Sequence, residues 1–135
     1  MFSLTLVTPQ KKIVEGAQLK EVFIPAFRGE IEILPGHAPL ITTLTEGVVK
    51  YRIDGTEELK AVAISWGYCE VTVEGEVNIL AETAETPEEI DLKRAEDSRQ
   101  LALDRLANVT FDEFDEYQKR FMRAEARITA KKDHH

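Results

Sequence analysis

The spacing of apolar side chains changes near residue 84 and divides the chain into two parts. Up to about residue 82, apolar side chains recur at every second position, which is typical of strands with one buried face. Asp54-Gly55 and Glu74-Gly75 separate alternating runs, as hairpin turns do. The pattern predicts an all-β sandwich or flattened barrel of about eight to ten strands, which forms a domain over residues 1–84.

Residues 85–135 carry a helical pattern instead. Glycine is absent there and Pro87 is the only proline. Thr86, Pro87 and Glu89 match a helix start, with a hydroxyl N-cap, proline at the first position and a carboxylate at the third. A second capping signal begins at Thr110. We therefore predict a C-terminal antiparallel hairpin with helices over about 87–107 and 111–132.

This hairpin offers few apolar side chains. Isolated pairs of helices of ~20 residues are marginal in water, so the hairpin needs a second surface, either the sandwich or a partner. A segment with two docking sites is suited to act as a switch. The apolar stripe of the second helix is spaced by three and four residues and comprises Phe114, Tyr117, Phe121, Ala124 and Ile128.

The charge balance limits the classes of partner. The formal net charge is −8, so nucleic acid is not expected as a partner, because phosphate binding needs a basic surface. No apolar run approaches the ~20 residues of a membrane span, and the N-terminus does not resemble a secretory signal. The single cysteine, Cys69, excludes an internal disulfide framework and is expected to be a buried structural thiol. His134 and His135 are given no functional role.

Charges in the tail are separated along the sequence. Between residues 85 and 116 there are eleven acids and four bases, and from residue 117 to the end there are six bases and two acids. One interpretation is simple complementarity with the helix dipoles, which contributes a few tenths of a kcal/mol per charge. The alternative is that the basic end docks on an acidic protein surface.

Residues that could support catalysis or metal binding are not grouped. His37 has no second histidine or cysteine near it in the sequence, so no metal site is expected. A turn histidine that makes local hydrogen bonds is the simpler interpretation. No motif for a nucleophile, a phosphate loop or a paired-histidine site is present. The chain is therefore not expected to be an enzyme.

The most specific stretch lies between Gly29 and Gly47. Pro35 fixes φ, and Gly36 can take the positive φ of a tight turn. The central part of the stretch reads Ile33-Leu34-Pro35-Gly36-His37-Ala38-Pro39-Leu40.

Taken as a string, this stretch closely resembles the signature of the epsilon subunit of F-type ATP synthases. The resemblance runs nearly end to end, from Val7-Thr8-Pro9 through a turn over residues 65–70 to the charged, alanine-bearing tail. The sequence departs from the family at Glu32 and Trp66, where the family more often carries glycine.

The resemblance implies a non-catalytic central-stalk subunit of a proton-translocating enzyme. Its sandwich would bind the gamma subunit and rest on the c-ring, with Glu30 and His37 facing the ring, and would couple rotation to ATP synthesis by the alpha and beta subunits. No cofactor is required. Association with the membrane would be peripheral and only through the complex, on the cytoplasmic face of a bacterial inner membrane.

The resemblance also assigns roles to the tail, which would move between a compact form and an extended form that inhibits ATP hydrolysis. In the extended form, cations of the second helix would meet an acidic loop of the beta subunit. The positions that carry over are Lys119, Arg120, Arg123, Arg127, Lys131 and Lys132.

A second motif is similar to one that binds regulatory ATP in some bacterial epsilon subunits. It comprises Ile90, Asp91, Arg94 and Ala95 at the predicted start of the first helix, with Arg123 and Arg127 of the second helix completing the site. Two arginines four residues apart face one way and can hold phosphates. The simpler interpretation is an ion pair between Asp91 and Arg94 on one helix face.

Two further functions remain open from the sequence. The chain could be a free-standing nucleotide-responsive binding module, with the tail as sensor and the sandwich as scaffold. A weaker alternative is a small enzyme with a cleft between the sandwich and the hairpin.

Overall fold

The computed structural model describes residues 2–133, so His134 and His135 lie outside the described residues. Nine strands are followed by a short 3-10 helix and two α-helices, which confirms the predicted fold class. The strands are β1 (Ser3–Val7), β2 (Lys12–Ala26), β3 (Gly29–Ile33), β4 (Leu40–Leu44), β5 (Gly47–Ile53), β6 (Leu59–Ile64), β7 (Gly67–Val71), β8 (Glu76–Ala81) and β9 (Ala84–Glu85). The helical elements are η1 (Pro87–Glu89), α1 (Leu92–Leu106) and α2 (Phe111–Asp133).

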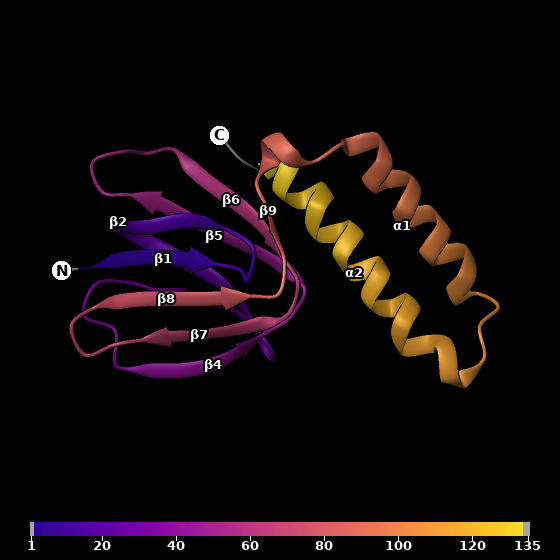
Figure 1. The fold of residues 1–135 in the computed structure, drawn as a ribbon, viewed down its shortest axis with the longest axis horizontal. Helices are drawn as coiled ribbons and strands as arrows, with labels where there is room; N and C mark the ends of the chain where they lie inside the picture. Colours follow the sequence, from indigo (N-terminus) through magenta and orange to yellow (C-terminus); the bar gives the residue numbers. More distant parts are fainter. Residues whose placement is uncertain (1, 134–135) are drawn as a thin grey trace.

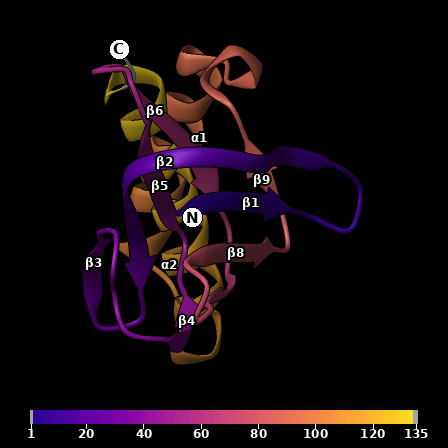
Figure 2. The same cartoon turned by 90° about the vertical axis from the view of Figure 1, so that its left-hand side faces the viewer.

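The strands form one sheet that folds over on itself. Their order is β1-β8-β7-β4-β2-β5-β6-β9, and β3 lies off this path against β2. The 15-residue strand β2 pairs with β1 through its first half and with β3 and β5 through its second half, and Figure 2 shows it crossing the sandwich. Because β1 pairs with both β2 and β8, the sheet closes into a flattened barrel.

The main core lies inside this barrel and follows the alternation of the sequence. Inward-facing aliphatic side chains such as Leu4, Leu6, Val22 and Ile24 are fully buried. All the buried members of this cluster come from residues 4–84, so none belongs to α1 or α2. The barrel therefore has a hydrophobic core of its own, independent of the hairpin.

The first helix begins later than predicted. The expected helix over about 87–107 is divided into the turn η1 and the helix α1, because Ile90 and Asp91 have extended backbone conformations. Ile90 is 5% exposed and packs with residues of the sandwich. Asp91 then caps α1 by accepting a hydrogen bond from the backbone N–H of Arg94 at 3.1 Å. The capping box at Thr86 forms as predicted, but it starts the 3-10 turn rather than α1.

The hairpin packs on one side of the barrel through its second helix. Helix α2 lies between α1 and strands β5 and β6, and α1 packs mainly on α2 (Figure 1). The C-terminal half of the predicted apolar stripe is buried, with Ala124 at 0% and Ile128 at 7% exposure, whereas Phe114 is 45% exposed. Only the end of α2 that is distant from the hairpin loop is thus held by the sandwich. Within residues 2–133, no helix is both long and apolar enough to cross a membrane.

Candidate functional site

The surface between α2 and the sandwich has a small apolar centre. Its six members are mostly alanines, and five lie on strands or on α2 while Ile90 comes from the linker. Alanine buries one methyl group, and burial contributes only about 0.8 kcal/mol per CH₂-sized group. The docked hairpin therefore depends on its polar contacts as well. The cluster, which we call the docking cluster, comprises Val48, Ala61, Ala63, Ile90, Ala126 and Ala130.

Three cations of α2, spaced four residues apart, reach oxygen atoms outside the helix. We call Arg123, Arg127 and Lys131 the cation stripe. Residues four apart share one helix face, so the stripe follows the side of α2 that faces the sandwich and the linker. The contacts are Arg123 Nε to Glu46 Oε1 at 4.0 Å, Arg127 Nε to Glu85 Oε1 at 2.6 Å, and Lys131 Nζ to the Pro87 carbonyl oxygen at 2.7 Å.

The linker between the two parts is held by a further ion pair. Lys11 Nζ donates to Glu89 Oε2 at 2.6 Å, and the backbone N–H and hydroxyl of Thr86 both donate to Glu89 Oε1 at 3.0 Å. The hydrogen bond from Lys11, together with those from Thr86, lowers the pKa of Glu89 to about 2. The carboxylate of Glu89 is thus ionised over the whole physiological range and fixes η1 against the start of β2.

The first ATP motif is built into the packing at the start of α1. Ile90 belongs to the docking cluster and Ala95 is 2% exposed. Asp91 serves as the N-cap, and its contact with Arg94 is to the backbone N–H and not to the guanidinium. Of the four motif residues, Asp91 and Arg94 are the exposed ones, so they are the pair that a ligand could reach.

The two arginines of the ATP motif line a cavity between the helices. Its volume is about 190 Å³, which is below the ~300 Å³ at which small-molecule pockets begin. The four residues at the start of α1 do not line it. Arg123 and Arg127 therefore line one cavity, whereas Asp91 and Arg94 do not line it. The lining residues are Ser98, Leu101, Ala102, Tyr117, Arg120, Arg123 and Arg127.

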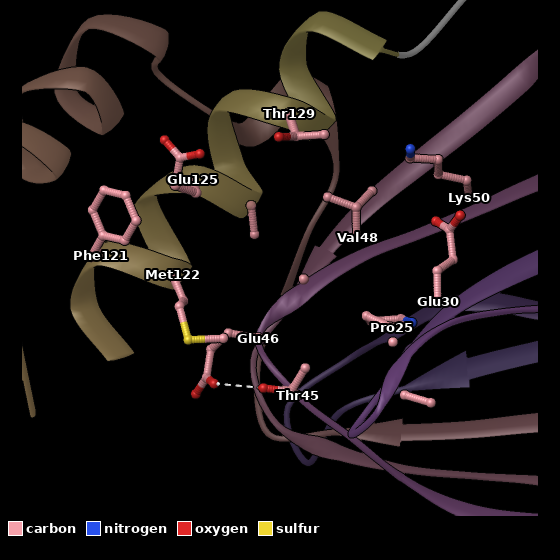
Figure 3. A pocket seen from close by; sticks show the side chains of 14 residues that line it. Pro25, Glu30, Thr45, Glu46, Val48, Lys50, Phe121, Met122, Glu125 and Thr129 are labelled. Atoms are coloured by element: carbon pink, nitrogen blue, oxygen red, sulfur yellow. Dashed lines mark hydrogen bonds between the residues drawn. The ribbon is translucent and has the colours of Figure 1, made fainter. Parts of the chain in front are cut away.

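A larger groove of about 360 Å³ separates the other side of α2 from the sandwich. In Figure 3 the side chain of Met122 reaches from α2 towards Glu46, whose carboxylate lies beside Thr45. The groove also includes Glu30 on β3 and Glu125 on α2. It is open to solvent next to the buried carboxylate of Glu46, whose side chain is 5% exposed.

The predicted c-ring residues lie on the exposed end of the β2–β3 hairpin and in the loop that follows it. Glu30 is in β3 and pairs with Pro25 in register. His37 is exposed, and its Nδ1 lies 2.6 Å from the Ala38 carbonyl oxygen. Since a carbonyl only accepts, Nδ1 carries a proton. The two side chains are free of the core and available at the surface.

The remaining cations of the predicted inhibitory surface do not belong to the cation stripe. Lys119, Arg120 and Lys132 are exposed. Arg120 pairs with Glu116 one turn away at 2.7 Å and lies over the Tyr117 ring at 5.1 Å. The six predicted cations thus divide into the three of the stripe, which contact the sandwich or the linker, and three exposed residues, of which Arg120 also lines the cavity between the helices.

Metal-binding groups do not converge within residues 2–133. No group of three or more histidine, cysteine, aspartate or glutamate side chains in these residues could hold a metal ion. Cys69 is fully buried, and burial together with the charge of Glu70 raises the pKa of its thiol to about 12. This thiol is unsuited to act as a nucleophile.

Sequence reasoning did not identify Glu46 and Glu85 as partners of the cation stripe. Glu85 lies in the two-residue strand β9 and Glu46 lies between β4 and β5. Neither residue belongs to a recognised sequence motif, and both are distant from α2 in the sequence. The spacing of Arg123 and Arg127 places them on one helix face, but it does not indicate which carboxylates of the chain lie opposite.

The fold is similar to that of chains in two solved mitochondrial ATP synthase structures. The chain is similar to a chain of the Euglena gracilis mitochondrial ATP synthase (OSCP/F1/c-ring), with a TM-score of 0.82, 22% identity, and coverage of 93% of this chain and 78% of that one. A chain of the central stalk/c-ring of the Tetrahymena thermophila mitochondrial ATP synthase gives a TM-score of 0.65 at 13% identity, and 96% of each chain is covered. At these identities the likeness concerns the fold.

Sequence relatives give the family. The ATP synthase epsilon chain of Bdellovibrio bacteriovorus is 48% identical over 94% of this chain and 91% of its own length. The ATP synthase epsilon chain of Desulfitobacterium hafniense strain Y51 is 37% identical over 96% and 95%. Residues 1–87 match the family model described as ATP synthase, Delta/Epsilon chain, beta-sandwich domain. The resemblance in the sequence is confirmed, and the chain belongs to the ATP synthase delta/epsilon chain family.

Proposed function

We propose that the chain is a non-catalytic central-stalk subunit of a proton-translocating F-type ATP synthase. The observation that carries the proposal is the 48% identity to an ATP synthase epsilon chain over nearly the whole length of both chains. The sandwich would bind the gamma subunit and rest on the c-ring, with Glu30 and His37 at that contact. The complex would be attached to a bacterial inner membrane on its cytoplasmic face.

The hairpin is proposed to inhibit ATP hydrolysis when it leaves the sandwich. Its small docking cluster and its few polar contacts support a docked form of limited stability. Released helices would place cations of α2 on an acidic surface of the beta subunits and obstruct rotation. The cations Lys119 and Arg120 are exposed in the docked form, so they are suited to make the first contact.

The test adds the protein to an ATP synthase catalytic head that lacks this subunit and follows ATP hydrolysis. The full chain is compared with a version that ends at Thr86, which keeps the pairing of β9 with β6 and the whole barrel core. We expect both to bind and only the full chain to slow hydrolysis. If both versions bind and neither slows hydrolysis, the proposed inhibitory role of the tail is contradicted.

A matched pair of variants then tests the cations. Replacing Lys119 and Arg120 with glutamine removes two charges that do not contact the sandwich. We expect weaker inhibition with an unchanged compact form. As a control, glutamine at Lys12 and Lys93 removes two exposed charges outside α2 and should leave inhibition unaffected.

Regulatory binding of ATP is a second proposal and rests on Arg123 and Arg127, which line one cavity. Because the cavity is smaller than a nucleotide pocket, the helices would have to separate or the arginines reorient on binding. A ligand at a hundred times its dissociation constant stabilises the form it binds by about 2.7 kcal/mol, which is enough to shift a weakly docked hairpin. Calorimetry at millimolar ATP tests the proposal, and an absence of heat contradicts it.

The free-standing binding module is the alternative function. It predicts ATP binding without a stable complex with a gamma subunit. Co-purification with a cognate gamma subunit separates the two functions, and turnover by the isolated chain would favour the enzyme hypothesis instead.

A further inference from the structure

The cation stripe makes contacts of unequal quality along its length. Arg127 and Lys131 make direct contacts of 2.6 and 2.7 Å, whereas the Nε of Arg123 is 4.0 Å from the Oε1 of Glu46. The docked helix is therefore held closely near its C-terminal end, at Arg127 and Lys131, and more loosely at Arg123.

The loose contact involves two buried polar atoms. Glu46 Oε1 and Arg123 Nε are both buried and neither makes a hydrogen bond within the described residues. A buried polar atom without a partner costs about 1–3 kcal/mol, and more when it is charged. Their mutual attraction offsets this cost only in part at 4.0 Å. The buried carboxylate of Glu46 is therefore stabilised by Arg123, whose side chain as a whole is 42% exposed.

The apolar contacts are too few to decide the docking by themselves. The docking cluster contains one valine, one isoleucine and four alanines. Removal of a carboxylate opposite the stripe would leave Arg123 or Arg127 at the interface with an uncompensated charge. Because the side chains of Arg123 and Arg127 are 42% and 37% exposed, loss of the carboxylate opposite either one weakens the docking by up to about 1 kcal/mol, as for a pair near the surface. The lost interaction matters less once the helix moves into water.

We propose that Glu46 and Glu85 are intramolecular acceptors of the cation stripe and that they set how often α2 is free to engage an acidic surface of a partner. The proposal rests on the proposed function only in assigning that partner surface. A guanidinium bound to a carboxylate of the sandwich cannot bind a carboxylate of another protein with the same atoms. The sandwich thus competes with the partner for Arg123 and Arg127, and it restrains the inhibitory tail.

The first experiment measures hydrogen exchange of the α2 amides in the isolated full chain. Glu46→Gln and Glu85→Gln keep the shape of each side chain and remove its charge. Glu82→Gln is the matched control, because Glu82 is an exposed carboxylate of the same domain. We expect residues 123–132 to exchange up to about fivefold faster in the two test variants and no change in the control.

Protection of the β1 and β8 amides checks that the barrel remains folded. If Glu85→Gln disturbs β9, Arg127→Gln removes the same ion pair from the helix side and should give the same acceleration. Added salt provides an independent readout, since it screens exposed ion pairs. Exchange in α2 should rise with salt in the unaltered chain and rise less in the double variant of Glu46 and Glu85, which keeps the exposed pair between Arg99 and Glu125.

Exchange in α2 that equals the control, or that becomes slower, overturns the proposal. The second experiment measures inhibition of the catalytic head by the same variants. We expect Glu46→Gln and Glu85→Gln to inhibit at lower concentration than the unaltered chain, although neither residue lies in the tail. Faster exchange without any inhibition by any variant supports the intramolecular restraint and contradicts the inhibitory function, so the two failures are distinguishable.

Discussion

Lys11 and Glu89, 78 residues apart in the sequence, form an ion pair with 2.6 Å between Nζ and Oε2. Lys11 stands at the end of the β1–β2 turn and Glu89 at the end of η1. The pair therefore attaches the linker of the hairpin to the opposite end of the chain. Together with the contact from Lys131 to the Pro87 carbonyl oxygen, it fixes the linker from both sides.

The pair predicts a pH dependence of the linker. The hydrogen bonds of Glu89 lower its pKa from an ordinary value of 4.5 to about 2. A carboxyl with a depressed pKa in the folded state contributes stability above the unfolded pKa and loses it as the pH falls through the folded value. The contribution of Glu89 should thus be complete above about pH 5 and lost progressively between pH 4.5 and 2.

Lys11→Met tests this prediction. This substitution removes the hydrogen bond from Lys11, which is the largest cause of the low pKa of Glu89. The pKa should therefore rise towards its ordinary value but stay below it, because the hydrogen bonds from Thr86 remain. NMR titration of the Glu89 carboxyl measures the change directly. Lys12→Met is the control, since Lys12 pairs with Glu15 and not with Glu89. An unchanged pKa in Lys11→Met would show that Thr86 alone holds the carboxylate.

A second prediction concerns the two roles of Asp91. As the N-cap of α1, Asp91 accepts a hydrogen bond from the backbone N–H of Arg94. Replacement of a capping residue by alanine lowers the stability of the helix by about 1 kcal/mol. Asp91→Ala should therefore accelerate exchange in the first turn of α1 about fivefold. Asp91→Asn keeps the cap and removes the charge. If Asp91 contacts a bound nucleotide through its charge, the asparagine variant should lose the calorimetric signal of ATP without loss of the helix.

The alternation of apolar side chains was sufficient to predict the barrel, because each strand has one face on the core. Leu4 and Leu6 are fully buried while Thr5 between them is not. The capping residues at Thr86 were read correctly as a helical start, yet α1 begins only at Leu92. Burial of Ile90 in the docking cluster requires an extended backbone there, and no local pattern indicates that requirement.

Sequence reasoning placed Arg123 and Arg127 on one face but could not supply their partners. The carboxylates of Glu46 and Glu85 meet them because β9 and the β4–β5 connection lie at the side of the barrel that α2 covers. Such contacts depend on the tertiary fold, and their sequence positions carry no periodicity. The same is true of Lys11 and Glu89.

A third prediction concerns the close approach of two strands at Gly67. A Cβ atom at this position would lie 2.2 Å from the Leu80 carbonyl oxygen and 2.8 Å from the Ala81 Cα. Both are backbone atoms of a neighbouring strand, so β7 and β8 would have to separate. Gly67→Ala should destabilise the protein by about 3 kcal/mol or more, measured by urea unfolding.

Gly55→Ala is the comparison for this variant. A Cβ atom there would meet open space, but the residue has a φ of +86°, and a left-handed conformation costs an L-residue about 1–2 kcal/mol. The loss should therefore be smaller than at Gly67. Equal losses would indicate that β7 and β8 separate with little cost.

The last prediction concerns the small residues that let α2 approach the sandwich. Ala130 is fully buried in the docking cluster, and it does not line the groove in which Met122 lies. A leucine at this position has no space without a shift of the helix, and such overpacking typically costs 1–3 kcal/mol. Because the barrel core lies elsewhere, the cost should fall on docking and not on the sandwich. Ala130→Leu should accelerate exchange in α2 and leave the protection of β1 and β8 unchanged, whereas Gln118→Leu on the exposed face of α2 should change neither. Loss of protection throughout the barrel would instead show that α2 and the sandwich unfold as one unit, and a hairpin that leaves an intact sandwich would then be excluded.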